Sequence, residues 1–345
     1  MGWSNFQLAV PGSNSLYSGI AAVSRHPNTM ELWSIGQDGS VNGEYWYAGA
    51  IWQRYQLAPA GSGSPTGNIA AVSRASHTME LWFTARDGSV RDYYWYEGGS
   101  WQNFQLAPPG SASPSGGIAA VSRAPNTMEV WFAGLDGSVK DHYWYEGAGW
   151  KNFQLAPPGS AASSGSIAAV SRASHTMEVF FNGRDGSIKD YYYYETGGWK
   201  NFQLAPPNTA STTGGIAAVS RYPDSMEVWA VCQDGSVHDY YWYASENANG
   251  GWRNFQLAPP GSAAKSGGIS AVSREQNTME VFFTGRDGSV QDHYWYLGSG
   301  WRGFTLAPPN SAALAGGIKA VSRASNTMEV WFVGRDGSTK DYYYY

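Results

Sequence analysis

The sequence predicts an all-β fold, a seven-bladed β-propeller, and the first observation behind this prediction is a phrase that recurs seven times. One copy, over residues 116–132, reads Gly-Gly-Ile-Ala-Ala-Val-Ser-Arg-Ala-Pro-Asn-Thr-Met-Glu-Val-Trp-Phe. Its Arg recurs in steps of 49 residues five times and 53 residues once. A period near 50 is typical of propellers and solenoids, in which each repeat forms one supersecondary unit. We therefore predict a single domain over residues 1–345.

The second observation is that each repeat contains four strand-like runs. In the second repeat Asp87-Gly88 joins two runs that are rich in β-branched and aromatic residues. Asp-Gly between such runs is a strong hairpin signal, because the turn needs positive φ values that Gly accepts. The first run is the least bulky and suits the crowded axis, whereas the fourth run suits the rim. The runs are 69–74, 78–84, 89–96 and 101–106.

The third observation concerns how the ring closes. The Trp of the fourth run first occurs at Trp3, before any first run, and the chain ends at Tyr345 after a third run. We therefore predict that residues 3–8 complete the blade that begins at about residue 316. This closure covers two sheet edges that would otherwise be open to aggregation.

Composition excludes several functions. A formal net charge of −5 argues against a nucleic-acid or anionic-membrane surface, and no stretch approaches the apolar length needed for membrane insertion. The lone Cys232 excludes an internal disulfide framework and suits a reducing compartment. No signal peptide is recognisable after Met1. We therefore expect synthesis in the cytoplasm and, for a role outside the cell, release by a non-Sec route.

The seventeen Trp residues fall into three columns of the repeat. The second-run column accepts Phe180 and Phe282, and the third-run column accepts Tyr193 and Tyr344, so we interpret both as packing between blades. The fourth-run column follows a Gly-rich loop and accepts no substitute, which indicates contact with a ligand. Its members are Trp3, Trp52, Trp101, Trp150, Trp199, Trp252 and Trp301.

Two polar columns are equally regular. An Arg ends each first run and a Glu follows each Met, and both should lie at the same end of the blade as the loop before the fourth-run Trp. We therefore expect Arg, Glu and Trp to converge on one edge of each blade. The set is either a structural ion pair or a sugar site with planar charged groups for hydroxyls and an aromatic face for C–H groups. The residues are Arg25, Arg74, Arg123, Arg172, Arg221, Arg274 and Arg323, with Glu31, Glu80, Glu129, Glu178, Glu227, Glu280 and Glu329.

No metal, cofactor or catalytic centre is predicted. The Asp-Gly-Ser turns, from Asp38 to Asp336, are interpreted as hairpin turns, and the six His form neither a metal set nor a triad. A glycosidase needs two carboxylates with unlike pKa values at one place, which seven equivalent Glu cannot supply. Departures from the repeat, such as Gly43 in a third run and four extra residues in 244–251, add no acid–base pair.

The whole chain resembles the seven-bladed, fucose-binding propeller lectins of insect-pathogenic Photorhabdus bacteria. The resemblance is carried by Ala-Val-Ser-Arg, Thr-Met-Glu-Val-Trp-Phe, Asp-Gly-Ser-Val and Trp-Lys-Asn-Phe-Gln-Leu-Ala-Pro-Pro-Gly. It implies binding of L-fucose and related or O-methylated sugars between blades, and a role in host interaction. A more distant similarity is to six-bladed fungal fucose lectins. Their second strand has Arg where this chain has Glu, so their arrangement of site residues does not carry over.

Repetition favours a multivalent lectin whose partners are glycans carrying fucose or related sugars. Several weak sites on one rigid ring raise avidity by roughly 10²–10⁴ on a glycan-covered surface. The alternative is a protein-interaction propeller, although such scaffolds usually present varied surface residues rather than repeated ones. The sequence leaves open which sugar is preferred, how many sites are active and whether the chain forms a homo-oligomer.

Overall fold

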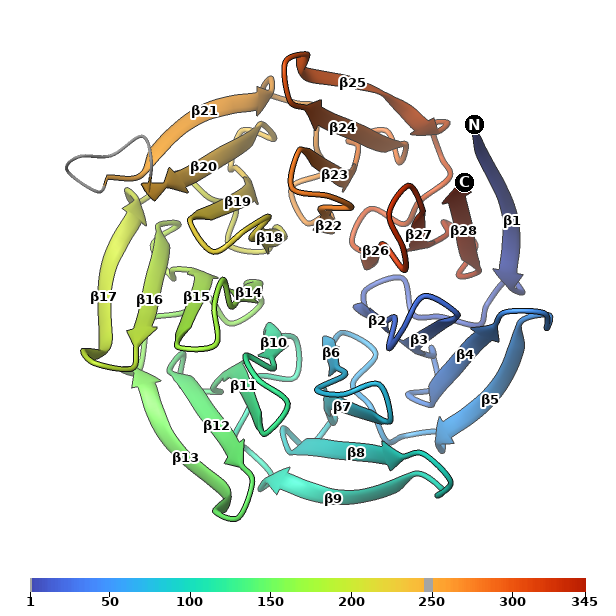
Figure 1. Cartoon of the computed structure of the whole chain (residues 1–345), viewed down its shortest axis with the longest axis vertical. Helices are drawn as coiled ribbons and strands as arrows, with labels where there is room; N and C mark the ends of the chain where they lie inside the picture. The colour runs from blue at the N-terminus through green and yellow to red at the C-terminus, as the bar shows by residue number, and fades with distance from the viewer. Residues whose placement is uncertain (1, 245–250) are drawn as a thin grey trace.

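Seven four-stranded antiparallel sheets surround a central axis like the blades of a propeller (Figure 1). The structure, a computed structural model, describes residues 2–244 and 251–345. The longer loop expected in 244–251 thus lies mostly outside the described residues. We number the blades 1–7 by the chain order of their inner strands. The predicted fold class is confirmed.

The inner strands are four residues long and built mainly from small side chains, as the crowding near the axis requires. Each begins with Ile and ends with Val, and the Arg of the repeated phrase follows two residues later. The inner strands are β2 (Ile20–Val23), β6 (Ile69–Val72), β10 (Ile118–Val121), β14 (Ile167–Val170), β18 (Ile216–Val219), β22 (Ile269–Val272) and β26 (Ile318–Val321).

The second strands are buried along their whole length. They are β3 (Thr29–Ile35), β7 (Thr78–Thr84), β11 (Thr127–Ala133), β15 (Thr176–Asn182), β19 (Ser225–Val231), β23 (Thr278–Thr284) and β27 (Met328–Val333). Asp-Gly-Ser turns connect them to the third strands. In blade 1 the Asp38 carboxylate accepts the Ser40 amide at 2.8 Å and Gly39 has a φ of 81°, which is the predicted hairpin geometry.

The third strands begin with alternating buried and half-buried residues and become more exposed toward their ends. They are β4 (Val41–Tyr47), β8 (Val90–Tyr96), β12 (Val139–Tyr145), β16 (Ile188–Tyr194), β20 (Val237–Tyr243), β24 (Val290–Tyr296) and β28 (Thr339–Tyr344). Each pairs with an outer strand, and a register shift near its start is present in all seven blades.

The outer strands form the rim of the ring. They are β5 (Gln53–Ala58), β9 (Gln102–Ala107), β13 (Gly149–Ala156), β17 (Gly198–Ala205), β21 (Arg253–Ala258), β25 (Gly300–Ala307) and β1 (Trp3–Ala9). β1 pairs with β28, placing Trp3 opposite Tyr344 and completing blade 7. The two chain ends therefore meet in one blade (Figure 1), and the predicted closure is confirmed.

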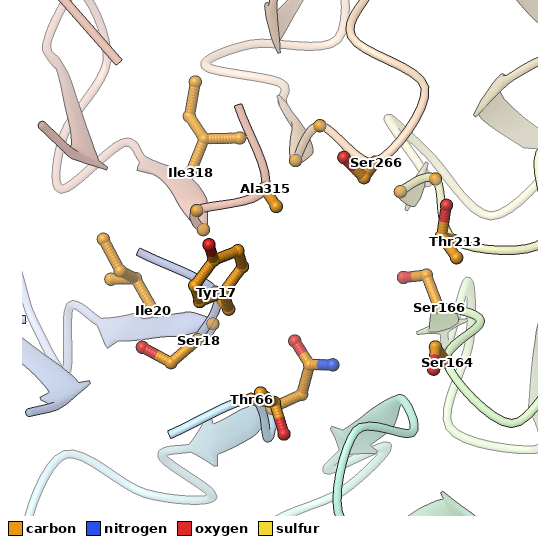
Figure 2. Close-up of a pocket in the computed structure, with 18 of the residues that line it drawn as sticks. Tyr17, Ser18, Ile20, Thr66, Ser164, Ser166, Thr213, Ser266, Ala315 and Ile318 are labelled. Atoms are coloured by element: carbon orange, nitrogen blue, oxygen red, sulfur yellow. The ribbon is translucent and has the colours of Figure 1, made fainter. Parts of the chain in front are cut away.

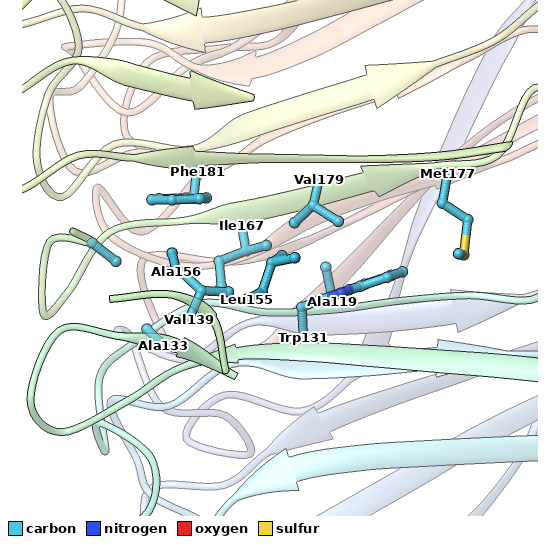
Figure 3. Packing of buried hydrophobic residues seen from close by; sticks show 11 residues of the cluster. Ala119, Trp131, Ala133, Val139, Leu155, Ala156, Ile167, Met177, Val179 and Phe181 are labelled. Atoms are coloured by element: carbon cyan, nitrogen blue, oxygen red, sulfur yellow. The ribbon is translucent and has the colours of Figure 1, made fainter. Parts of the chain in front are cut away.

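The hydrophobic core lies between blades. One cluster joins Trp131 and Ala119 of blade 3 to Met177, Val179 and Phe181 of blade 4 (Figure 3). The second-strand Trp residues are 0% exposed, so the expected packing role of this column is confirmed. Truncating such a residue to Ala costs about 3–5 kcal/mol. No helix among the described residues is long and apolar enough to cross a membrane.

Candidate functional site

The repeated Arg joins its own blade to the next one. In blade 1 the Arg25 guanidinium donates to the carbonyl oxygen of Ser76 in blade 2 at 2.9 Å. Its central carbon also lies 4.7 Å from the ring centroid of Trp95 on β8. The same contact to a carbonyl of the following blade is formed by Arg74, Arg123, Arg172, Arg221 and Arg323. The Arg column therefore contributes to ring assembly as well as to the surface between blades.

A Glu and a Tyr of the same blade hold the Arg from the other side. Arg25 Nε lies 3.0 Å from Glu31 Oε1, and the Arg25 guanidinium donates to the Tyr47 hydroxyl at 3.2 Å. In blade 3 the Tyr145 hydroxyl donates to the Glu129 carboxylate at 2.9 Å. The seven Glu residues are only 2–4% exposed. In blades 1, 3, 5 and 6 the Glu lies within 3.0–3.9 Å of the Arg and helps to fix its orientation, while its own oxygens are largely hidden from solvent.

The outer-strand Trp lies against the preceding blade, not its own. Trp52 of blade 1 packs edge-on against Trp331 of blade 7, with ring centroids 6.0 Å apart and planes at 84°. The same geometry recurs at all seven interfaces. The expectation that Arg, Glu and Trp converge within one blade is therefore wrong. Strand side chains project perpendicular to their sheet, and in a propeller that direction leads to the neighbouring blade.

The grouping of Arg323, Glu329 and Trp52 lines one cleft, and the repeated Trp contacts place the other outer-strand Trp residues at the corresponding interfaces, so we assign seven equivalent groupings, each built from two adjacent blades. Arg25 and Glu31 lie with Trp101; Arg74 and Glu80 with Trp150; Arg123 and Glu129 with Trp199; Arg172 and Glu178 with Trp252; Arg221 and Glu227 with Trp301; Arg274 and Glu280 with Trp3; Arg323 and Glu329 with Trp52.

The grouping between blades 7 and 1 lines an open cleft of about 530 Å³. Blade 7 supplies the Arg and Glu and several aromatic rings, while blade 1 supplies two Trp residues and the loop between its third and outer strands. A cleft of 300–1,000 Å³ that is mostly apolar with a few convergent polar groups is typical of small-ligand sites. The lining residues are Phe6, Met30, Trp46, Ala50, Ile51, Trp52, Arg323, Glu329, Tyr343 and Tyr345.

Two columns of the cleft were not predicted as site residues. The third-strand Trp, interpreted from the sequence as packing, lies under the Arg of the preceding blade at 4.7–5.0 Å from its central carbon. At two interfaces Tyr193 and Tyr344 replace it, at 5.8 and 5.4 Å. The other column is the Tyr that ends each third strand or follows it. Tyr occurs at this position in all seven repeats, and this regularity could have marked the column as part of the site from the sequence. It comprises Tyr47, Tyr96, Tyr145, Tyr194, Tyr243, Tyr296 and Tyr345.

A second buried acid lies near the Glu in blades 2–7. In blade 3 the Trp131 indole donates to Asp141 Oδ2 at 2.6 Å. Burial, reinforced by the Glu129 carboxylate, holds the pKa of Asp141 well above its usual range, and burial also raises the pKa of Glu129. The other pairs are Glu80 with Asp92, Glu178 with Asp190, Glu227 with Asp239, Glu280 with Asp292, and Glu329 with Asp341.

The arrangement combines fixed guanidinium donors, a Tyr hydroxyl and aromatic faces, which together suit a ligand with hydroxyl groups on one side and C–H groups on the other. Within residues 2–244 and 251–345, no three His, Cys, Asp or Glu side chains form a metal-binding group. The Glu–Asp pair is repeated alike in blades 2–7, so within these blades it does not single out one place as an acid–base centre. Fold and clefts together define the class of carbohydrate-binding β-propellers.

Comparison with known families identifies the chain more narrowly. The family described as fungal fucose-specific lectin matches residues 1–206 and 115–344. The chain belongs to this family, whose members bind carbohydrate as lectins and are not enzymes. The two matches overlap because the repeats are nearly interchangeable, so one stretch of family sequence fits more than one set of blades. A search of curated protein sequences found no match.

Solved structures show the same fold. The BP39L lectin from Burkholderia pseudomallei superposes with a TM-score of 0.87 at 17% identity, covering 97% of this chain and 96% of that one. The SapL1 lectin, solved in complex with α-methyl fucoside, gives 0.63 at 20% identity over 86% and 98% of the two chains. The six-bladed fucose-binding lectin of Aleuria aurantia gives 0.61 at 18% identity over 86% and 98%.

Proposed function

We propose that the protein is a multivalent lectin that binds L-fucose and related or O-methylated sugars in the clefts between neighbouring blades. Because the chain belongs to a fucose-specific lectin family, its function is sugar binding. The observation that carries the choice of site is the cleft between blades 7 and 1, where a positioned Arg and two Trp residues from different strands converge.

Each part of the cleft suits one part of a deoxy sugar. Arg323 has its guanidinium stacked 5.0 Å from the Trp46 ring centroid and anchored at 3.0 Å to the Pro27 carbonyl. Its orientation is therefore fixed before a ligand arrives, which reduces the entropy lost on binding. The remaining guanidinium protons suit adjacent ring hydroxyls. Exposed apolar groups such as Ile51, 78% exposed, suit a methyl group.

The proposal assigns the predicted Arg and outer-strand Trp residues to the ligand surface and the Glu residues to the support beneath it. A single cleft of this kind binds weakly, and a millimolar dissociation constant corresponds to about −4 kcal/mol. Engagement of several clefts on one rigid ring raises the apparent affinity by roughly 10²–10⁴. The repeat therefore provides the affinity that one site lacks.

Calorimetric titration with methyl α-L-fucoside tests the site. Arg323→Ala should lower the measured stoichiometry by one site and leave the affinity of the remaining sites unchanged. Arg323→Lys should lower it as well, because the ammonium cannot reproduce the planar fork of donors.

The matched control is Arg184→Ala, an exposed Arg at a turn on the opposite face, where three other repeats also have Arg and the remaining three have Gln or Leu. It should keep the wild-type stoichiometry. An unchanged stoichiometry in Arg323→Ala would remove this cleft from the proposal. A glycan array without signal, together with capture of a protein partner, would favour the alternative of a protein-interaction scaffold.

The proposal includes recognition of fucosylated glycans on host cells, as the resemblance to Photorhabdus lectins implies. Agglutination of fucose-bearing cells that free fucose inhibits would support it. Sedimentation at several protein concentrations determines whether copies of the chain associate, which would multiply the sites further.

A further inference from the structure

The centre of the ring is a channel that breaks the sevenfold pattern at one point. The channel contains an inner cavity of about 200 Å³ between the inner strands. At the second position of these strands six blades carry small side chains, and blade 7 carries Lys319. The six small residues are Ala21, Ala70, Ala119, Ala168, Ala217 and Ser270.

Lys319 has no counter-ion in the channel. No Asp or Glu lines the inner cavity or its mouth, and within the described part of the chain no hydrogen bond or salt bridge is formed by the Lys319 ammonium. Burial lowers the pKa of this ammonium, which has no compensating partner. Lys319 is half-buried in the channel wall without an acidic neighbour among the residues that line the cavity, so a small anion that enters the channel would stabilise the charged ammonium.

The channel also offers neutral hydrogen-bond donors. The inner edge of each inner strand pairs with no other strand, which leaves backbone amides beside the cavity. The Ser270 hydroxyl lies close to Lys319, because it accepts the amide of Ala320 at 3.0 Å. A charged donor surrounded by such groups is typical of anion sites.

An open route leads to the cavity from one face of the ring. The mouth, about 340 Å³ in volume, is ringed by hydroxyl side chains such as Thr66, Ser164 and Thr213 (Figure 2). It shares the lining residues Ile20 and Ile318 with the inner cavity, so the two spaces are continuous. The mouth faces away from the Arg ends of the inner strands, and a ligand there would not compete with sugar.

We propose that the central channel binds one small anion, a halide or a short carboxylate, at the Lys319 ammonium. The site would be present once per ring, in contrast to the clefts between blades. It is independent of the proposed sugar sites, since it shares no residue with them.

Line broadening of the chloride-35 NMR signal tests this inference. The wild-type protein should broaden the signal saturably, and added acetate should reverse the broadening by competition. Lys319→Ala should lower the protein-dependent broadening at least tenfold. This variant should fold, because five of the other inner strands already have Ala at this position.

Lys319→Met provides a second test that keeps most of the side-chain stem and removes only the charge. It should lose the broadening as well. Lys151→Ala, which removes an exposed Lys from β13, should broaden the signal as the wild type does. Absence of saturable broadening in the wild type, or wild-type broadening in both Lys319 variants, would overturn the proposal. Fucoside binding should be the same in all four proteins.

Discussion

Blade 1 and blades 2, 3, 5 and 7 share one backbone fold and a buried Trp on the second strand, but the indole of that Trp has a different hydrogen-bond acceptor in blade 1. In blade 3 the Trp131 indole donates to the buried carboxyl group of Asp141 at 2.6 Å. In blade 1 Gly43 replaces that Asp, and the Trp33 indole donates to the Tyr55 hydroxyl at 2.9 Å instead. Both Trp residues are 0% exposed. A neutral hydroxyl can therefore replace a buried acid without altering the core.

Blade 1 places its second buried acid elsewhere. Glu44, next to Gly43, is 1% exposed and lies 3.3 Å from Arg54 of the outer strand. Other third strands have Tyr or His at the position of Glu44, and other outer strands have Asn or Gly at that of Arg54. The comparison teaches that a buried polar residue differs between blades together with its hydrogen-bond or ion-pair partner, because a buried polar group without a partner is costly.

The largest expected effect comes from restoring the Asp of the other blades in blade 1. A Cβ atom at Gly43 would lie 2.4 Å from Cζ of Tyr55, closer than any contact allows. Gly43→Asp should therefore lower the free energy of unfolding by about 3 kcal/mol, measured by urea denaturation. Gly43→Asp with Tyr55→Phe restores the pair that blade 3 has at these positions, Asp141 opposite Phe153, and it frees the ring from its hydrogen bond with Trp33, so the ring can turn outward as Phe153 does and most of the loss should be recovered. An equal loss in the double variant would show that the two positions are independent.

Removal of Arg54 should have the next largest effect. Burial already raises the pKa of Glu44 to about 7, although Arg54 acts to lower it. Arg54→Ala leaves an unpaired buried carboxylate and should cost about 2 kcal/mol at pH 8. The loss should be smaller at pH 5, where Glu44 is protonated. Adding Glu44→Gln should abolish the pH dependence, and a loss that is equal at both pH values would contradict the ion-pair explanation.

The acid pairs of blades 2–7 should make the protein sensitive to alkaline pH. The pKa values of Glu129 and Asp141 are raised above the ordinary 4.5 and 3.8, so the folded state binds more protons than the unfolded chain. This contribution to stability is complete below the ordinary values and is lost as pH rises through the folded-state values.

Asp141→Asn should therefore gain about 1 kcal/mol of unfolding free energy at pH 9 relative to the wild type, since one pKa unit corresponds to about 1.4 kcal/mol. The control is Asp136→Asn in the adjacent turn, where hydrogen bonds from Ser138 lower the pKa of the carboxyl group. At pH 9 the free energy of unfolding of this control should not exceed that of the wild type. Equal pH profiles for the wild type and Asp141→Asn would contradict a raised pKa of Asp141 in the folded protein.

The smallest expected effect compares the two groups that accept a hydrogen bond from a second-strand indole, Asp141 in blade 3 and Tyr55 in blade 1. Trp131→Phe leaves the buried carboxyl group of Asp141 without its hydrogen-bond donor, whereas Trp33→Phe leaves the Tyr55 hydroxyl without its donor. Both lose similar volume, so the difference in unfolding free energy should be about 1 kcal/mol, with Trp131→Phe the less stable. Thermal and urea denaturation at pH 7 measure it. A larger loss in Trp33→Phe would reverse the comparison between blades.

The sequence predicted the strands and the ring closure but misplaced one part of the site. Periodicity located four runs per repeat, and the first-run Ala and second-run Trp were assigned to packing, as the structure confirms. Trp52 was expected beside the Arg and Glu of its own repeat, and it lies with Arg323 and Glu329 of blade 7. A repeat unit read along the chain does not reveal which neighbour its side chains face.

By itself, the sequence determined the number of blades, their strand order and the identity of the unvarying polar and aromatic columns, because strand alternation and turn chemistry are local properties. Only the tertiary structure decided which columns meet. Adjacent blades bring Arg25 against Trp95 and Trp33 against Trp101 across one interface, and the closed ring places Lys319 in a channel whose lining has no acid. Both results depend on the rotation from one blade to the next, which no single repeat encodes.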